Sequence, residues 1–205
     1  MAPLVRASHP VIYYVRHGLT DWNVQQRLQG RLDVPLNAEG CAQAACCGEI
    51  MRDLFAREGR LPQELAYVSS PLARARRTME IMRVALGLPE SGFLLDPRLV
   101  EIAFGEWEGM SYADVIARDG DVVARREADK WGFKPPGGES YAQLTLRLSE
   151  WYETLERDTV VAAHGGTARA LIAHLAIAEP DAATHYAIDQ GVVYVLAPGA
   201  IARYG

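Results

Sequence analysis

Two histidines each follow an apolar run that predicts a β-strand. The run 11–15 ends in Arg16 and His17, and the run 159–163 ends in His164. Open α/β sheets bind ligands at the carboxyl ends of their strands. A histidine there can act as a nucleophile or a base, and an arginine there can grip phosphate oxygens. The glycines that follow both histidines let the backbone turn tightly and expose N–H groups. Together the two units predict a phosphate site with two histidines.

Further donors for an anion follow the first histidine closely. They are the side-chain amides, the glycine and the arginines of this stretch: Asn23, Gln29, Gly30, Arg27 and Arg31. Arg74 and Arg76 lie in or near the first turn of a helix predicted over 71–86. Positive charge at a helix N-terminus costs up to about 1 kcal/mol, and an anion bound over the helix end would account for it. A solvated arginine face is the alternative interpretation.

Composition favours a single globular domain over 1–205 that takes a small anionic ligand. The 205 residues are 49% hydrophobic and carry a net charge of −5, which argues against general nucleic-acid binding. No signal peptide and no apolar run of membrane-spanning length is evident, so we expect a cytoplasmic protein with no membrane partner. Cys41, Cys46 and Cys47 match no zinc pattern and are expected to be buried, unpaired thiols. Residues 1–9 are expected to form a loose tail.

The elements that must position these residues alternate between strands and helices. Strands are predicted over 11–15, 65–69, 93–95, 159–163 and 191–196, with 201–204 as a hairpin edge, and helices over 38–58, 71–86 and 167–176 and after Ser140. Asn37 and Ser140 are predicted N-caps, and Ser70 is a third, before Pro71. Right-handed crossovers between parallel neighbours would bring the strand ends to one edge. Residues 19–36 read as a loop with one short helical turn. Two further short helices are predicted over 113–117 and 121–131.

An extended match resembles the signature of the histidine phosphatase superfamily, also called the phosphoglycerate mutase-like family. It comprises Val15, Arg16-His17-Gly18, Thr20, Trp22-Asn23, Arg27-Leu28-Gln29-Gly30, Asp33, Pro35-Leu36-Asn37 and Gly40. Leu19 departs from the pattern, because many members carry Glu or Gln there. Three later segments also match the family: 69–78, 99–109 and 161–166. The resemblance implies a three-layer α/β/α sandwich with a mostly parallel central sheet and a cap insertion, which we place at 102–140.

The resemblance also implies roles for individual residues. It implies His17 as the nucleophile and Glu101 as the proton donor, rather than Glu106 or Glu108. Catalytic roles are implied for His17, Glu101, His164, Arg16 and Arg74, and phosphate binding for Arg16, Asn23, Gln29, Gly30, Arg74, His164 and Gly165. Arg76 is a weaker phosphate ligand. His164, if protonated, would add a third cation to the two arginines. Tyr112, Trp131 and Phe133 are either pocket walls or ordinary packing residues.

The activity implied is metal-independent hydrolysis of a small phosphate ester through a phosphohistidine, with no cofactor. The segment Phe104-Gly105-Glu106-Trp107-Glu108-Gly109 favours the phosphatase branch over a mutase. A phosphoglycerate mutase and a non-catalytic phosphate-binding protein of the same fold remain alternatives. A metal hydrolase is a third, although the histidines lack metal-ligand spacing. The partner expected is a small-molecule phosphate ester, with homodimer formation left open.

Overall fold

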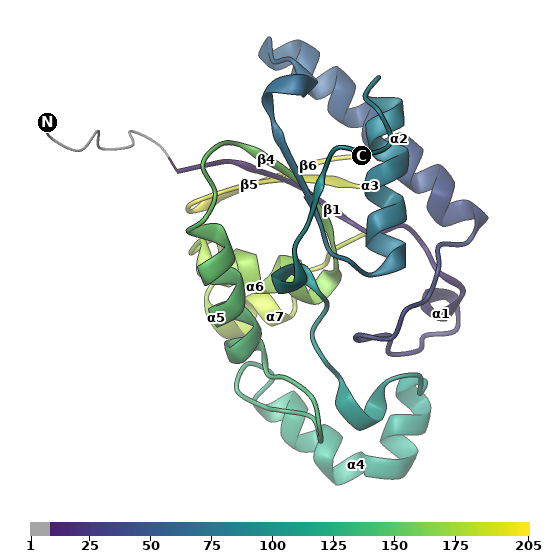
Figure 1. Cartoon of the computed structure of the whole chain (residues 1–205). Helices are drawn as coiled ribbons and strands as arrows, with labels where there is room; N and C mark the ends of the chain where they lie inside the picture. Colours follow the sequence, from purple (N-terminus) through teal and green to yellow (C-terminus); the bar gives the residue numbers. More distant parts are fainter. Residues whose placement is uncertain (1–8) are drawn as a thin grey trace, which may run out of the picture.

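A six-stranded sheet forms the centre of the molecule, shown in the computed structural model of Figure 1. The structure describes residues 9–205, so all but the last residue of the expected N-terminal tail lies outside it. The strands are β1 (Ile12–Arg16), β2 (Ala66–Ser69), β3 (Leu94–Leu95), β4 (Thr159–Ala163), β5 (Val193–Ala197) and β6 (Ala200–Tyr204). Their order across the sheet is β3-β2-β4-β1-β5-β6.

The first four strands in this order run parallel, and the β5–β6 hairpin pairs with β1 in the antiparallel sense through β5. In the register, Arg16 of β1 lies beside Ala163 of β4, and Ser69 of β2 lies beside Ala162. The carboxyl ends of β1, β2 and β4 therefore meet at one edge of the sheet. This confirms the mostly parallel sheet that the sequence predicts.

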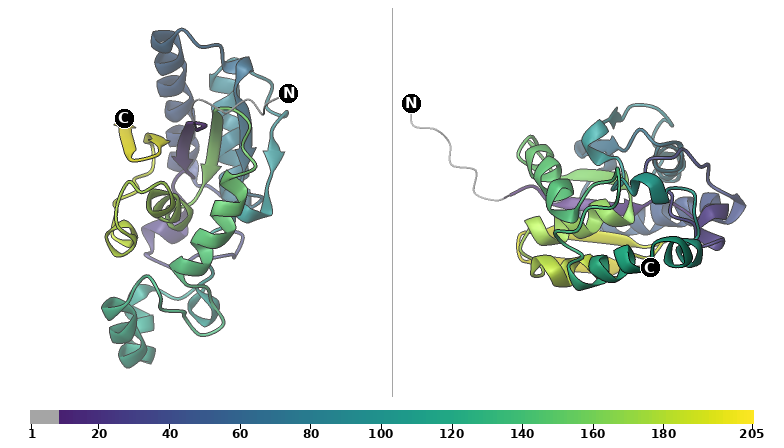
Figure 2. Two further views of the ribbon diagram at one scale, coloured as in Figure 1. Left: turned by 90° about the vertical axis from the view of Figure 1, so that its left-hand side faces the viewer. Right: turned by 90° about the horizontal axis from the view of Figure 1, so that it is seen from below.

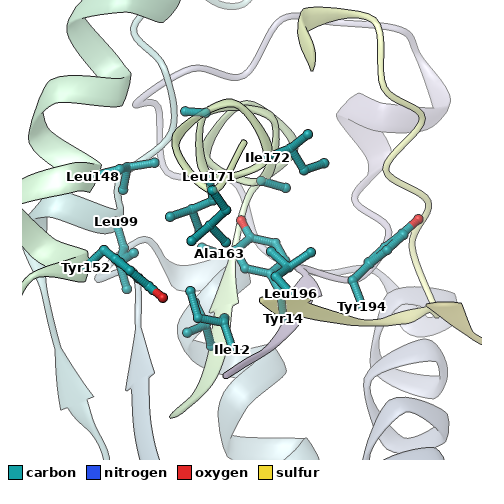
Figure 3. Packing of buried hydrophobic residues seen from close by; sticks show 14 of the residues in the cluster. Ile12, Tyr14, Leu99, Leu148, Tyr152, Ala163, Leu171, Ile172, Tyr194 and Leu196 are labelled. Atoms are coloured by element: carbon teal, nitrogen blue, oxygen red, sulfur yellow. The ribbon is translucent and has the colours of Figure 1, made fainter. Parts of the chain in front are cut away.

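Helices cover both faces of the sheet and complete the three layers (Figures 1 and 2). They are α1 (Asp21–Val24), α2 (Ala38–Glu58), α3 (Ala73–Ala85), α4 (Tyr112–Ala128), α5 (Tyr141–Tyr152), α6 (Gly165–His174) and α7 (Pro180–Thr184). Successive side chains of a strand point to opposite faces. Tyr13 and Val15 therefore pack with α2 and α3, whereas Ile12 and Tyr14 pack with α5 and α6 (Figure 3).

Three single turns of 3-10 helix join these elements: η1 (Pro62–Glu64), η2 (Pro97–Leu99) and η3 (Gly105–Trp107). Neither these turns nor the short helix α7 was predicted. The predicted capping of α2 and α5 is confirmed: Asn37 accepts from the Gly40 N–H at 2.9 Å, and Ser140 accepts from the Gln143 N–H at 3.2 Å. The two helices predicted over 113–131 form the single helix α4, which is kinked at Asp119.

The predicted start of α3 is wrong. The helix begins at Ala73 instead of residue 71, and Ser70 does not cap it. The capping acceptor is Asp33 from the 19–36 loop, whose Oδ1 accepts from the Ala73 N–H at 2.7 Å. Helix α6 also starts earlier than predicted, at Gly165 instead of residue 167, so it follows His164 directly.

Helix α4 and the segment before it extend away from the sheet at the lower end of Figure 1. Trp107, Val115 and Val123 form a small hydrophobic cluster there, separate from the two clusters that flank the sheet. This region is joined to the 19–36 loop, because the Leu28 N–H donates to the Met110 carbonyl at 2.9 Å.

The three cysteines of α2 are unpaired, but only Cys47 is buried. The expectation of burial is wrong for Cys46, which is exposed, and Cys41 is half-buried. Only one side of helix α2 packs against the core, and Cys46 lies on the exposed side. Across residues 9–205, no helix combines the length and the apolarity needed to cross a bilayer.

Candidate active site

The ends of β1 and β4 bring the two motif histidines together. The His17 N–H donates to the Ala163 carbonyl at 2.9 Å, which extends the strand pairing by one residue. The next residue of β4 is His164, and the two imidazole rings lie 5.2 Å apart between centroids. The site predicted from two separate sequence motifs is therefore one site in space.

His17 is buried and held in one orientation. Its Nδ1 lies 2.8 Å from the Gly18 carbonyl oxygen. A carbonyl only accepts, so Nδ1 carries the proton and Nε2 presents a lone pair. Burial, and then the positive charges of Arg74 and Arg16, hold the pKa of His17 well below its usual value of 6.5. The ring is therefore neutral at physiological pH, as a nucleophile must be.

Close packing of glycines keeps this turn in place. A Cβ on Gly18 would overlap the backbone of Gly40 at the start of α2. The Gly18 N–H donates to Thr78 Oγ1 at 3.1 Å, which ties the turn to α3. The glycine after His17 is thus needed for a close approach between the β1 turn and α2.

Arg16 and Arg74 each keep one guanidinium donor without a hydrogen-bond partner in the described chain. Arg16 donates one Nη to the Ile188 carbonyl at 2.8 Å. Arg74 is fully buried and donates to the carbonyls of Leu32 and Gly30 at 2.7 and 2.8 Å. The Nε of each guanidinium is buried with no partner among residues 9–205. Burial lowers the pKa of both guanidinium groups. Neither group forms an ion pair with a carboxylate among residues 9–205.

His164 lies at the start of α6, with one ring nitrogen bonded and the other free. Its Nε2 is 2.8 Å from Ser70 Oγ, and its Nδ1 is buried without a partner in the described chain. Burial, then the charges of Arg74 and other neighbours, lower the pKa of His164 well below 6.5. His164 is therefore neutral at physiological pH. The third cation foreseen for a protonated ring therefore requires a bound anion, which would offset burial and the charges of the two arginines.

Glu101 reaches the same helix start from the other side. Its Oε2 accepts from the Gly166 N–H at 3.1 Å, and its Oε1 accepts from the Ile102 N–H at 2.9 Å. A Cβ on Gly166 would overlap Glu101 Oε1, so this glycine makes room for the carboxylate. Trp107, in the segment that follows this acid, donates its indole N–H to Asp119 at 2.7 Å.

The remaining predicted phosphate-binding residues differ in the contacts that they make within the protein. Asn23 is half-buried, and its Oδ1 accepts from Gln190 Nε2 at 3.1 Å. Gln29 is buried, and its Oε1 has no partner in the described chain. Gly30 contributes its carbonyl to Arg74 and has a positive φ of 50°, so it positions that arginine.

Gly165 lies between two guanidinium groups. A Cβ built on it would lie 3.4 Å from Arg169 Nη1 and 3.7 Å from Arg16 Nε. Arg76, by contrast, is on the exposed face of α3 and pairs with Glu80 at 3.5 Å, so the structure does not bring it to the site. Of the region's aromatic residues, Phe133 stacks on Trp107 at 6.2 Å, and Trp131 packs against the core beside α5 and α6.

The sequence did not predict the roles that two residues, Ser70 and Gln190, have in the site. Ser70 was predicted to be a helix cap, but its hydroxyl bonds His164. Gln190 donates to the His17 carbonyl as well as to Asn23, both at 3.1 Å. It precedes β5 with no motif around it, so no local signal marks it. Among residues 9–205, no three His, Cys, Asp or Glu side chains are grouped as a metal-binding set.

The chain is similar to several known proteins over most of its length. A family model described as the histidine phosphatase superfamily (branch 1) matches residues 12–200. The chain is 32% identical to 2,3-bisphosphoglycerate-dependent phosphoglycerate mutase 2 of Gloeobacter violaceus, over 83% of this chain and 78% of that protein. It is 35% identical to glucosyl-3-phosphoglycerate phosphatase of Mycobacterium tuberculosis, over 78% and 73%. The crystal structure of TTHB049 from Thermus thermophilus superposes with a TM-score of 0.70 at 34% identity, covering 95% of this chain and 98% of that one.

Proposed function

The chain belongs to the histidine phosphatase superfamily, and from that premise we propose that it hydrolyses phosphomonoesters of a small metabolite through a phosphohistidine on His17. The proposal is supported chiefly by the unpartnered polar atoms. Five buried side-chain N or O atoms lack a partner within residues 9–205, and four belong to Arg16, Gln29, Arg74 and His164. Buried polar groups are normally satisfied. The Arg16 and Arg74 Nε atoms are donors and His164 Nδ1 can be one, whereas Gln29 Oε1 is an acceptor. Two guanidinium donors left free beside a neutral imidazole therefore support an anionic ligand at this position.

In the first step, His17 Nε2 attacks the phosphorus in line with the ester oxygen. The new N–P bond forms as the P–O bond to the leaving group breaks. Glu101 gives its proton to the departing alkoxide, which leaves as a neutral alcohol. Arg16 and Arg74 hold the equatorial phosphoryl oxygens, whose negative charge they stabilise.

In the second step, water hydrolyses the phosphohistidine. Glu101, now ionised, takes a proton from the water as the water oxygen bonds phosphorus. The N–P bond breaks, and the electron pair returns to His17 Nε2. Inorganic phosphate leaves, and both His17 and Glu101 regain their starting protonation states.

Labelling with a phosphorylated substrate, quenched in alkaline detergent, tests the nucleophile. Wild-type protein should retain label that is lost in acid and stable in base, as a phosphohistidine is. His17→Ala should retain none, and Arg76→Gln, an exposed arginine outside the site, should label like wild type. Label retained by His17→Ala would contradict the proposal.

The alternative activity is that of a phosphoglycerate mutase, because one relative carries that name. Hydrolysis of p-nitrophenyl phosphate and isomerisation of 3-phosphoglycerate, each with and without bisphosphoglycerate, distinguish the two. We expect hydrolysis to dominate, and full hydrolytic activity to survive chelator treatment. Isomerisation faster than hydrolysis would favour the mutase, and activity lost to the chelator would favour a metal hydrolase.

Residues 102–140 are proposed to act as the cap that selects the substrate. This is supported by their own hydrophobic cluster and by their contacts with the loop that orients Arg74. A cytoplasmic location is proposed because all three cysteines are unpaired thiols. The substrate proposed is a small phosphate ester, with no cofactor.

A further inference from the structure

An ion pair lies beside the segment that carries Glu101. Arg147 on α5 donates its Nε to Glu139 Oε1 at 2.9 Å and an Nη to Oε2 at 3.0 Å. The two side chains are only 18% and 12% exposed. A two-point arginine–carboxylate pair fixes the relative orientation of both groups. We call this pair the Glu139–Arg147 brace.

The arginine of the brace also holds the backbone before and at the acid. Its guanidinium donates to the carbonyls of Arg98, Val100 and Glu101, the last two at 2.8 and 3.2 Å. Of these three acceptors, Arg98 belongs to the turn η2, whereas Val100 and Glu101 lie in neither a helix nor a strand. Carbonyls in such a segment have no regular backbone partners, and Arg147 supplies the donors that such groups require.

The carboxylate of the brace holds the backbone after the acid. The Glu139 N–H donates to the Ala103 carbonyl at 2.9 Å, and the Ala103 N–H donates to Glu139 Oε2 at 3.4 Å. The Leu99 and Ile102 side chains are buried in the core on either side of Glu101. The segment is thus fixed by polar contacts on both sides of the acid, while the acid itself points to α6.

We propose that the Glu139–Arg147 brace positions Glu101 for proton transfer to the leaving group. The inference rests on the proposed function, in which Glu101 is the proton donor. The hydrogen bonds of Arg147 go to Glu139 and to the backbone around Glu101, so it acts through that residue. Misplacement of a catalytic group by about 1 Å costs roughly a hundredfold in rate. Loss of the brace should therefore weaken acid catalysis specifically.

The choice of ester separates loss of acid catalysis from general damage. An alkyl phosphate such as glycerol phosphate needs a proton on its leaving oxygen, whereas p-nitrophenolate leaves as a stable anion. In Arg147→Gln we expect kcat/KM for the alkyl ester to fall roughly tenfold to a hundredfold, and that for the aryl ester to fall at least ten times less. Arg147→Lys, which keeps the charge but not the planar fork, should behave like Arg147→Gln.

Arg98→Gln is the matched control. Arg98 lies on the same segment, but its side chain pairs with Asp96 and does not reach Glu139. In this variant, kcat/KM for the alkyl ester and kcat/KM for the aryl ester should change by the same factor. The proposal would be overturned if the Arg147 variants lost kcat/KM equally for both esters, or if Arg147→Lys kept the wild-type kcat/KM for both. If the Arg147 variants do not fold, Glu139→Gln carries the same comparison of esters.

A failure of the proposed function would be recognised separately, because wild-type protein would then hydrolyse neither ester. The brace would in that case be judged by amide hydrogen exchange of residues 99–103. Faster exchange in Arg147→Lys than in wild type supports a brace on this segment, and unchanged exchange overturns it.

Discussion

At the scale of single residues, charge state decides what the two histidines do. Both rings are buried beside Arg16 and Arg74, and burial together with these charges holds the pKa of each well below 6.5, so both are neutral at physiological pH. For His17 this leaves a lone pair free for attack. For His164, a bound phosphate would favour the charged ring. Phosphate binding would therefore raise the pKa of His164 and lead to uptake of a proton.

The same pKa shifts make stability depend on pH. The unfolded chain takes up a proton on His17 and on His164 near pH 6.5, but the folded chain does so only at lower pH. The free energy of unfolding should therefore fall as pH falls below about 6.5, by up to about 1.4 kcal/mol per pH unit for each histidine. Urea denaturation between pH 7 and pH 5 measures this slope.

The single variant His164→Asn provides the control for that slope. It removes one of the two titrating groups, so its stability should depend less steeply on pH than that of wild type. An identical slope in wild type and variant would show that the folded-state pKa of His164 is not depressed.

At the scale of elements, the beginnings of two helices build much of the site. Helix α6 starts directly after His164, and its first turn receives the carboxylate of Glu101. Helix α3 carries Arg74 in its first turn and is capped from the 19–36 loop, whose carbonyls hold that arginine. The loop and the helix therefore position the guanidinium jointly.

Gly166→Ala tests the space at the start of α6. The added methyl group would overlap Glu101 Oε1 and should displace the carboxyl, which lowers kcat/KM for an alkyl phosphate more than tenfold. Gly165→Ala adds the same methyl group one residue earlier, at ordinary contact distances, and should cost less. Equal losses in steady-state assays of the two variants would contradict this assignment.

Asp33→Ala tests the unexpected cap of α3. Removal of the Asp33 carboxylate leaves the Ala73 N–H without its acceptor and should lower the free energy of unfolding by about 1 kcal/mol in urea denaturation. Ser70→Ala, at the residue predicted to be the cap, should leave the helix end intact and act on His164 instead. A larger loss of stability from Ser70→Ala than from Asp33→Ala would restore the sequence-based cap.

At the scale of the whole molecule, the helices of the sheet core and of the 102–140 region differ in how many side chains they bury. Helix α5 buries five side chains against the main core, whereas α4 buries only Val115 and Val123. Elements with few buried apolar contacts open at low free energy. Helix α4 is therefore better able than α5 to move relative to the sheet.

Amide hydrogen exchange measures that difference directly. Protection in α4 should be lower than in α5, because fewer apolar contacts must break to open it. Vanadate, added as an analogue of the transferred phosphoryl group, should raise protection in α4 more than in α5 if residues 102–140 cap the site. Equal protection of the two helices in the free protein would contradict this account.

The sequence by itself determined where the proposed catalytic histidines lie along the strands. An apolar run that ends in a histidine and a glycine specifies its own local structure, so His17 and His164 were predicted to lie at strand ends and are found there. The caps of α2 and α5 and the mostly parallel sheet follow from similarly local patterns and from crossover rules.

The tertiary structure alone decided the charge of His164, the roles of Ser70 and Gln190, and the brace behind Glu101. Each depends on groups distant in the sequence: Ser70 and His164 are 94 residues apart, and Gln190 and His17 are 173 apart. The pKa of a buried group is set by the water it has lost and the charges it meets. Neither quantity exists until the chain has folded.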